Sequence, residues 1–244
     1  MVREEVLDRL VDYGKISRRD VVLEVGAGRG ELTKRIAEKA GKVIAVELDE
    51  SLASEAAENI KGYDNVELLI GDVLKLRPKG FNKVVSNPPY RISTRLIDWL
   101  IESPPELIVL TLQREFASKL LAKPGSHKYV FTSFLAQLFY EVRIAEIVPR
   151  IFFNPTPKVD SAIVVMNRRV DVRGIRPEEK SFLKLLFTRR RQTVRKVLKS
   201  FLKEYSREDL GSLLPRSILS KRVYQLKPEE LLTCSSILIK LRGL

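Results

Sequence analysis

The feature that most constrains the fold is a series of short apolar runs, rich in β-branched residues, that alternate with helix-like stretches. The runs are apolar nearly throughout, which is typical of strands buried on both faces of a sheet. Apolar residues at helical spacing fill the segments between them. This alternation predicts a parallel sheet with helices on both faces. The predicted strands are 20–25, 42–47, 66–70, 83–86 and 107–112, and the predicted helices are 3–13, 31–40, 50–60, 92–102 and 113–122.

The pattern changes after the fifth predicted strand. Segments 140–148 and 160–168 follow one another closely, which predicts an antiparallel pair at the far edge of the sheet. Beyond Arg173-Gly174 the pattern is wholly helical, so we expect a first domain over 1–172 and a small all-helical domain over 173–244. The helices expected in the second domain are 177–189, 191–204, 206–212 and 228–242.

Charge is unevenly distributed between these two parts. The chain has 244 residues and a net charge of +13. Residues 1–167 carry 24 basic and 23 acidic side chains, whereas residues 168–244 carry 20 and 8, a net charge of +12. A strongly basic helical part favours a polyanionic partner, because neutralising phosphates releases condensed counterions. The alternative is a solvated basic surface, and a membrane surface is disfavoured because the region lacks a strong aromatic face.

Three counts exclude other classes of protein. The single cysteine, Cys234, excludes an internal disulfide and a cysteine-based metal cluster. The single histidine, His127, excludes a mechanism that needs two. No apolar run approaches the roughly 20 residues of a membrane-spanning helix. We therefore expect a cytoplasmic, metal-free protein that does not enter membranes, with a monomer as the default state.

A glycine-rich loop follows the first predicted strand and opens a helix. It reads Glu-Val-Gly-Ala-Gly-Arg-Gly-Glu-Leu-Thr over residues 24–33, with glycines at 26, 28 and 30. Glu31 stands where a dinucleotide fingerprint needs its third glycine, and the Gly-Lys-Ser/Thr of a phosphate-binding P-loop is absent. The spacing resembles the cofactor loop of class I S-adenosylmethionine methyltransferases. A tight structural turn is the alternative.

Two carboxylates follow the next two predicted strands. Glu47 ends the second strand, where it can accept hydrogen bonds from both ribose hydroxyls of a nucleotide. Asp72, in Gly71-Asp72-Val73, follows the third strand and can accept one from an adenine amino group. Carboxyl ends of parallel strands meet at one edge of the sheet, where such folds bind ligands. Gly26, Gly28, Glu47, Asp72 and Val73 are therefore predicted to bind the cofactor, against the alternative that the acids are helix caps.

A second loop, Asn87-Pro88-Pro89-Tyr90, follows the fourth predicted strand. An amine on an adenine ring or an amide is a weak nucleophile, because its lone pair is delocalised. The Asn87 amide oxygen and the Pro88 carbonyl can each accept one N–H, which localises that lone pair and aims it at a methyl donor. The prolines stiffen the loop, and Tyr90 offers a face for stacking on a flat substrate. The loop predicts methylation of nitrogen; a plain proline turn is the alternative.

Two further segments carry a resemblance to one family. Residues 153–162 read Phe-Asn-Pro-Thr-Pro-Lys-Val-Asp-Ser-Ala, and residues 187–196 read Phe-Thr-Arg-Arg-Arg-Gln-Thr-Val-Arg-Lys. With the two loops, they resemble the ribosomal RNA adenine dimethyltransferase family over roughly residues 3–244. That family's fold is a class I, Rossmann-like α/β domain with a mostly parallel seven-stranded sheet, joined to a small helical domain.

The resemblance also implies an activity. Members N6-dimethylate two neighbouring adenosines near the 3′ end of small-subunit ribosomal RNA, using S-adenosylmethionine, late in assembly of the subunit. It implies that Asn87 holds both cofactor and reacting nitrogen, that Pro88 assists, and that Tyr90 and Phe153 flank the adenine. The residues expected to bind RNA, or the immature small subunit, are Lys158, Arg189, Arg190, Arg191, Arg195 and Lys196.

The sequence departs from the family pattern in places. Members usually begin with an additional segment that contains a Gln-x-Phe-Leu stretch, and this sequence starts just after that point. Pro88 stands where leucine is usual. Asn-Pro-Pro-Tyr leaves a protein glutamine N5-methyltransferase as an alternative, and a non-catalytic RNA-binding assembly factor is a second one. DNA methylation is a weaker option.

Overall fold

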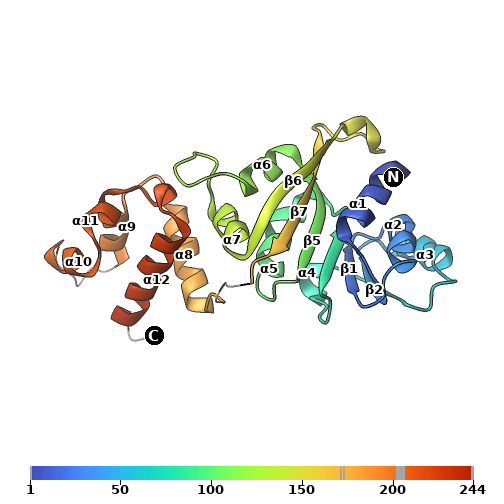
Figure 1. The fold of residues 1–244 in the computed structure, drawn as a ribbon, viewed down its shortest axis with the longest axis horizontal. Coiled ribbons are helices and arrows are strands. Elements are labelled where there is room, and N and C mark those ends of the chain that lie inside the picture. Colours follow the sequence, from blue (N-terminus) through green and yellow to red (C-terminus); the bar gives the residue numbers. More distant parts are fainter. Residues whose placement is uncertain (1, 171, 173, 202–206, 243–244) are drawn as a thin grey trace. The chain divides into compact units, whose positions relative to one another are not determined.

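The computed structural model describes residues 2–170, 172, 174–201 and 207–242. The chain divides into two compact units (Figure 1). The first comprises Met1–Ser118 and Phe139–Arg169, and the second comprises Lys119–Leu138 and Val170–Leu244. The second unit thus begins close to residue 172 in the C-terminal part, but it also includes a segment that the sequence assigned to the first domain. The functional division at residue 172 stays a prediction.

The first unit is built on one seven-stranded sheet with the order β3-β2-β1-β4-β5-β7-β6. Strands β1 to β5 are parallel, while β7 runs antiparallel to both β5 and β6. This confirms the predicted class I fold and the antiparallel pair at the edge. The strands are β1 Val21–Val25, β2 Lys42–Glu47, β3 Val66–Ile70, β4 Lys83–Ser86, β5 Leu107–Gln113, β6 Tyr140–Val148 and β7 Ser161–Arg168.

Helices connect these strands, and most lie within a few residues of their predicted bounds. The four-residue α4 was missed, because so short a segment has no helical periodicity. Asp72 caps its first turn by accepting from the Leu74 N–H at 2.9 Å. The elements are α1 Glu4–Gly14, α2 Glu31–Ala37, α3 Glu50–Asn59, α4 Val73–Leu76, η1 Tyr90–Ile92, α5 Ser93–Leu100, α6 Arg114–Leu120 and η2 Arg150–Phe152.

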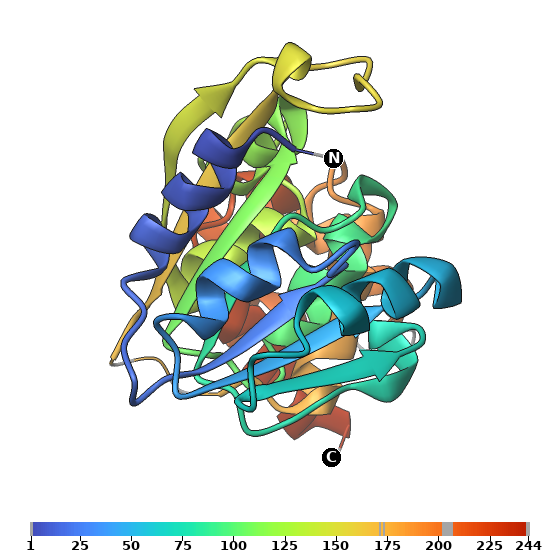
Figure 2. The same cartoon turned by 90° about the vertical axis from the view of Figure 1, so that its right-hand side faces the viewer.

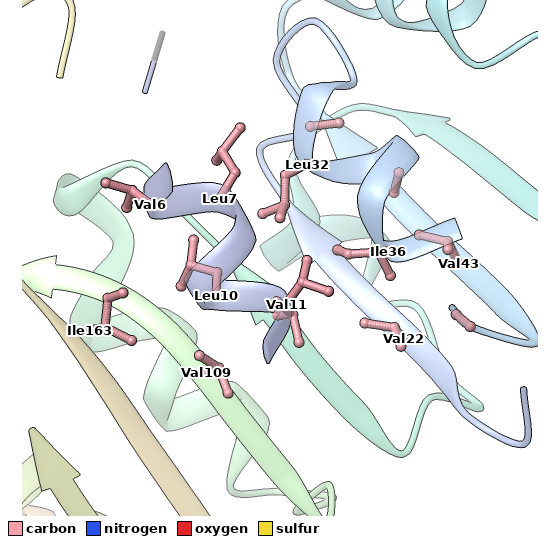
Figure 3. Packing of buried hydrophobic residues seen from close by; sticks show 14 of the residues in the cluster. Val6, Leu7, Leu10, Val11, Val22, Leu32, Ile36, Val43, Val109 and Ile163 are labelled. Atoms are coloured by element: carbon pink, nitrogen blue, oxygen red, sulfur yellow. The ribbon is translucent and has the colours of Figure 1, made fainter. Parts of the chain in front are cut away.

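Helix α1 closes one side of the core of this unit. Its apolar face carries Val6, Leu10 and Val11, all 3% exposed or less. These side chains pack with residues of α2 and of the strands, as Figure 3 shows for Ile36 and Val109. Burying such side chains stabilises the fold by about 1.5–3 kcal/mol each. Because α1 and α2 pack against the same sheet, the glycine loop that precedes α2 is held in a fixed position.

The N-terminal residues also reach the connection between β6 and β7. Val2 forms an antiparallel bridge with Phe153, and the Arg3 N–H donates to the Phe152 carbonyl at 2.9 Å. In Figure 2 the beginning of the chain accordingly lies beside this connection. The residues that precede α1 therefore hold the beginning of the segment 153–162 that the sequence singled out.

The second unit is helical in its described part. Its elements are α7 Phe131–Phe139, α8 Pro177–Thr188, α9 Val194–Phe201, α10 Arg207–Leu213, α11 Arg216–Ser220, η3 Val223–Gln225 and α12 Pro228–Arg242. Helices α7 and α11 were not predicted. The ends of the predicted helices 191–204 and 206–212 that fall on residues 202–206 lie outside the described residues.

Aromatic packing explains why Lys119–Leu138 belongs to the second unit. The rings of Phe131 and Phe134 lie 5.8 and 6.0 Å from that of Phe187, and the ring of Tyr129 lies 5.8 Å from it. Arg190 adds polar ties, since its Nη1 donates to the backbone carbonyls of His127 at 2.8 Å and Tyr129 at 3.2 Å. Segments far apart in sequence therefore share one small core.

Candidate active site

The glycine loop after β1 and the asparagine loop after β4 touch at Gly26. Gly26 has φ +81°, and its N–H donates to the Val46 carbonyl at 2.8 Å. A Cβ at this position would lie 3.3 Å from Cδ of Pro89, and only glycine adopts this backbone conformation without strain. Glycine at 26 therefore allows the two predicted loops to meet.

Gly28 forms an open part of the same loop. Its φ is +58°, and no atom lies within 4 Å of the place where a Cβ would be. Its N–H donates at 2.8 Å to Oε2 of Glu47 at the end of β2. The Glu47 hydrogen bond fixes the backbone of Gly28, and the open space beside it allows a ligand to approach the chain closely.

Glu47 and Asp72 stand at the ends of adjacent strands, as predicted. The second oxygen of Glu47 accepts from the N–H groups of Leu48 at 2.8 Å and Asp49 at 3.0 Å, so the carboxylate is fixed by three backbone donors. Asp72 is held by the N–H of Leu74. Each carboxylate oxygen can accept more than one hydrogen bond, so both groups keep capacity for hydroxyl or amino donors.

The asparagine loop is rigid at its base and free at its tip. Ser86, fully buried, donates to the Val25 carbonyl at 2.6 Å and accepts from the Val25 N–H at 3.1 Å, which ties the ends of β1 and β4 together. Pro88 is buried. Within the described chain, the side-chain amide of Asn87 has no hydrogen-bond partner. A partly buried amide on a fixed bend is thus available to a ligand. Sequence reasoning missed the role of Ser86.

Tyr90 and Phe153 are positioned by other contacts. The Tyr90 hydroxyl is hydrogen-bonded to the Ser161 hydroxyl at the start of β7. Burial raises the pKa of Tyr90, and the Ser161 hydrogen bond partly offsets this. Phe153 is 8% exposed and belongs to the hydrophobic cluster below α1. Neither ring lines the two cavities of this edge, so their roles beside an adenine stay predictions.

Two cavities meet at Gly26. One, of about 430 Å³, is lined by Glu24, Gly28 and Asn87 among others; the second, of about 590 Å³, is lined by Glu47, Asp72 and Val73 among others. The volumes are those of ordinary ligand sites. The residues present fit S-adenosylmethionine: carboxylates suit its hydroxyl and amino donors, and Leu48, Val73 and Ile92 provide apolar surface for a ring. The predicted cofactor residues are thereby brought together.

Glu24 is a site residue to which sequence reasoning gave no role. It is 1% exposed, lines the first cavity, and accepts from the Thr33 hydroxyl at 2.6 Å. Burial, to which the charge of Glu47 adds, raises the pKa of Glu24 to about 8, although the Thr33 hydrogen bond opposes this. The carboxyl therefore holds a proton at neutral pH. An acidic residue within an apolar strand was the available signal.

The predicted RNA-binding residues are of two kinds. Lys158, in the first unit, and Arg191 and Lys196, in the second, are exposed. Arg189 is exposed but donates to Ser200 at 2.6 Å and lies over the Phe201 ring, while Arg190 is committed to backbone carbonyls. Arg195 is half-buried. Arg190 therefore holds the second unit together, whatever else it contacts.

Two features are absent from the described residues. No helix there has the length and apolar character needed to cross a bilayer. No group of three or more histidine, cysteine, aspartate or glutamate side chains there could hold a metal ion. Cys234 is fully buried, and its burial raises the pKa of the thiol to about 12.

Comparison with known proteins points the same way as the geometry. The family model described as ribosomal RNA adenine dimethylase matches residues 1–240. A probable ribosomal RNA small subunit methyltransferase A from Thermococcus gammatolerans is 38% identical over 95% of this chain and 84% of its own. A dimethyladenosine transferase from Plasmodium falciparum has a TM-score of 0.82 at 28% identity, over 100% and 98% of the two chains. The 23S rRNA methyltransferase ErmE has a TM-score of 0.71 at 27% identity, over 98% and 99%.

Proposed function

The chain belongs to the ribosomal RNA adenine dimethylase family, and from this premise we propose that its substrate is the RNA of the small ribosomal subunit. It is an enzyme that uses S-adenosylmethionine to dimethylate adenine in ribosomal RNA. The finer proposal is that it modifies N6 of two adjacent adenosines near the 3′ end, on the immature subunit. We further propose that it works as a cytoplasmic monomer.

The choice of the small subunit is supported by its relatives. The Thermococcus protein, whose name specifies the small subunit, is 38% identical, whereas ErmE, whose name specifies 23S rRNA, is 27% identical. The family also argues against the alternatives that Asn-Pro-Pro-Tyr left open, because neither glutamine in a protein nor DNA is the substrate that its description names.

The single observation that carries the proposed mechanism is the amide of Asn87 beside the glycine loop, which has no hydrogen-bond partner among the described residues. We assign its oxygen and the Pro88 carbonyl to the two N–H groups of the adenine amine. Accepting both localises the nitrogen lone pair and orients it, so the contribution is positioning and polarisation. Tyr90 and Phe153 are assigned to the faces of the extruded base, because a base within a helix cannot reach such a pocket.

The cofactor residues have a separate task. When bound, S-adenosylmethionine supplies a methyl group activated by its sulfonium charge. We assign Glu47 to the ribose hydroxyls, Asp72 and Val73 to the adenine, and Gly26, Gly28 and Asn87 to the part nearest the reacting centre. Their backbone and carboxylate groups are already fixed by the protein, so little ordering accompanies binding.

We assign RNA binding to the exposed cations Lys158, Arg191 and Lys196, with Arg189, Arg190 and Arg195 as further candidates. Exposed guanidinium and ammonium groups neutralise phosphates, which carries most of the sequence-independent affinity for RNA. Affinity should therefore fall steeply with salt.

The test is transfer of labelled methyl from S-adenosylmethionine to small ribosomal subunits that lack the modification, followed by mass spectrometry of the digested RNA. We expect N6,N6-dimethyladenosine at two neighbouring positions of the small-subunit RNA. Label found only in large-subunit RNA would overturn the choice of subunit, and label on glutamine of a ribosomal protein would overturn the proposed substrate class.

A further inference from the structure

Two arginines at the mouth of the second cavity have no partner among the residues that the structure describes. Arg91 lies in η1, directly after Tyr90, and Arg95 lies in the first turn of α5. Both side chains are exposed and both line the cavity that contains Glu47 and Asp72. Neither makes an ion pair or a side-chain hydrogen bond within the described residues.

The position of the pair is fixed by the backbone of the asparagine loop. The Ile92 N–H donates to the Pro89 carbonyl at 3.1 Å, and the Ser93 hydroxyl donates to the Tyr90 carbonyl at 2.9 Å. Arg91 in η1 and Arg95 in α5 line the same cavity. A cation in the first turn of a helix is disfavoured by the helix dipole, so Arg95 is not there to stabilise α5.

The carboxylates of the cavity are not the missing partners. Glu47, Asp49 and Asp72 all accept from backbone N–H groups, and none lies within 4 Å of either guanidinium. In the proposed arrangement they face the ribose and adenine of the cofactor, which are uncharged. The two guanidinium groups are therefore available to an anionic group of a bound molecule.

We propose that Arg91 and Arg95 bind the backbone phosphate beside the target adenosine, an inference that rests on the proposed function. A base extruded toward Asn87 and Tyr90 leaves its phosphates at the rim of the site, next to Arg91. Guanidinium groups bind phosphate through paired N–H donors in a fixed geometry, which orients the strand as well as attracting it. The first unit thus positions the reacting nucleotide itself, in addition to any contacts of the basic second unit.

The test compares Arg91→Gln/Arg95→Gln with Arg19→Gln/Lys79→Gln. The control removes the same charge from exposed side chains that are unpaired within the described part of the chain. They lie near the opposite edge of the sheet, just before β1 and β4. Binding to unmodified small subunits is measured over a range of salt concentrations, S-adenosylhomocysteine affinity by calorimetry, and methyl transfer under single-turnover conditions.

We expect the first variant to bind the subunits about tenfold more weakly and its salt slope to fall by about 1 for each lost contact. Its affinity for S-adenosylhomocysteine and the behaviour of the control should not change. Weakened cofactor affinity with unchanged RNA binding would overturn the proposal, as would equal losses in both variants. If the wild type binds subunits without methylating them, the proposed function fails while the comparison of binding still decides the role of the arginines.

Discussion

Polar residues have different surroundings at the two ends of the parallel strands, which we call the amino edge and the carboxyl edge of the sheet. At the amino edge, Asp20 accepts from Ser17 at 2.7 Å, from Asn82 at 2.8 Å and from Lys83 at 2.9 Å. At the carboxyl edge, Asn87 and the pair Arg91 and Arg95 have no partners within the described chain, and Glu24 is buried as a neutral acid. The Asp20 cluster is satisfied within the protein and stabilises the fold, whereas Asn87, Arg91 and Arg95 are available to ligands.

We expect the polar contacts at the amino edge to contribute more to the free energy of unfolding than those at the carboxyl edge. Lys83 and Asp20 are 12% and 7% exposed, so Asp20→Ala leaves a nearly buried ammonium without its carboxylate partner, although the Lys15 carbonyl still accepts from it at 2.6 Å. We expect a loss of about 3–5 kcal/mol in the free energy of unfolding, measured by urea denaturation, with unchanged cofactor affinity in the folded protein. A loss of unfolding free energy no larger than that from breaking an exposed ion pair would contradict the proposed difference between the two edges.

The pH dependence of this edge follows from the same contacts. Burial alone would raise the pKa of Asp20, but the hydrogen bonds from Asn82, Lys83 and Ser17 lower it to about 2. The ionised carboxylate is favoured in the folded state, so its contribution is present above about pH 4 and is lost as pH falls toward 2.

The carboxyl edge should show the opposite pH dependence through Glu24. Its folded pKa of about 8 lies above the ordinary value of 4.5, so the folded state keeps a proton that the unfolded state loses between these values. Its contribution is complete below pH 4.5 and disappears as pH rises through 8, by about 1.4 kcal/mol per unit. Glu24→Gln should remove this slope, as urea unfolding at several pH values can check. Parallel pH profiles for both proteins would show that Glu24 ionises normally.

Two glycine substitutions with smaller expected effects should distinguish the close approach of Gly26 to Pro89 from the strain of a left-handed backbone conformation. Gly26→Ala introduces a strained φ of +81° and a Cβ 3.3 Å from Pro89, while Gly80→Ala introduces strain at φ +85° with no atom within 4 Å. Both should lose about 1–2 kcal/mol of stability. Only Gly26→Ala should lower the rate of methyl transfer, by more than about tenfold, because it displaces the asparagine loop. Equal rates of methyl transfer for the two variants would contradict the inference that Gly26 determines the position of the asparagine loop.

The sequence predicted the carboxyl edge better than the amino edge or the second unit. Glycine spacing, strand-terminal acids and Asn-Pro-Pro-Tyr are local patterns, and parallel strands must bring such patterns to one edge. The Ser86–Val25 tie joins residues 61 positions apart, and nothing in either segment alone marks it. Helix α7 was missed because its run Phe131–Phe139 is apolar on most sides, which obscures helical periodicity.

Site chemistry was also predicted unevenly. The sequence predicted Glu47 and Asp72 as ligand-binding acids, a role that stays a prediction. It gave no role to Glu24, because only burial and the Thr33 contact distinguish that residue. Arg190 was predicted as an RNA contact from its place in a basic run, yet its guanidinium binds the carbonyls of His127 and Tyr129. A charge pattern cannot separate a cation that holds a loop from one that faces solvent.

The central claim is that the Asn87 amide orients the reacting amine at the carboxyl edge. The most direct measurement is single-turnover methyl transfer to unmodified small subunits by Asn87→Ala, alongside its affinity for those subunits, with Asn167→Ala at the opposite edge as control. We expect transfer to fall by about 100- to 1,000-fold while RNA affinity and the control stay unchanged. Transfer at the wild-type rate, or RNA affinity that falls as far as the rate, would contradict the assignment.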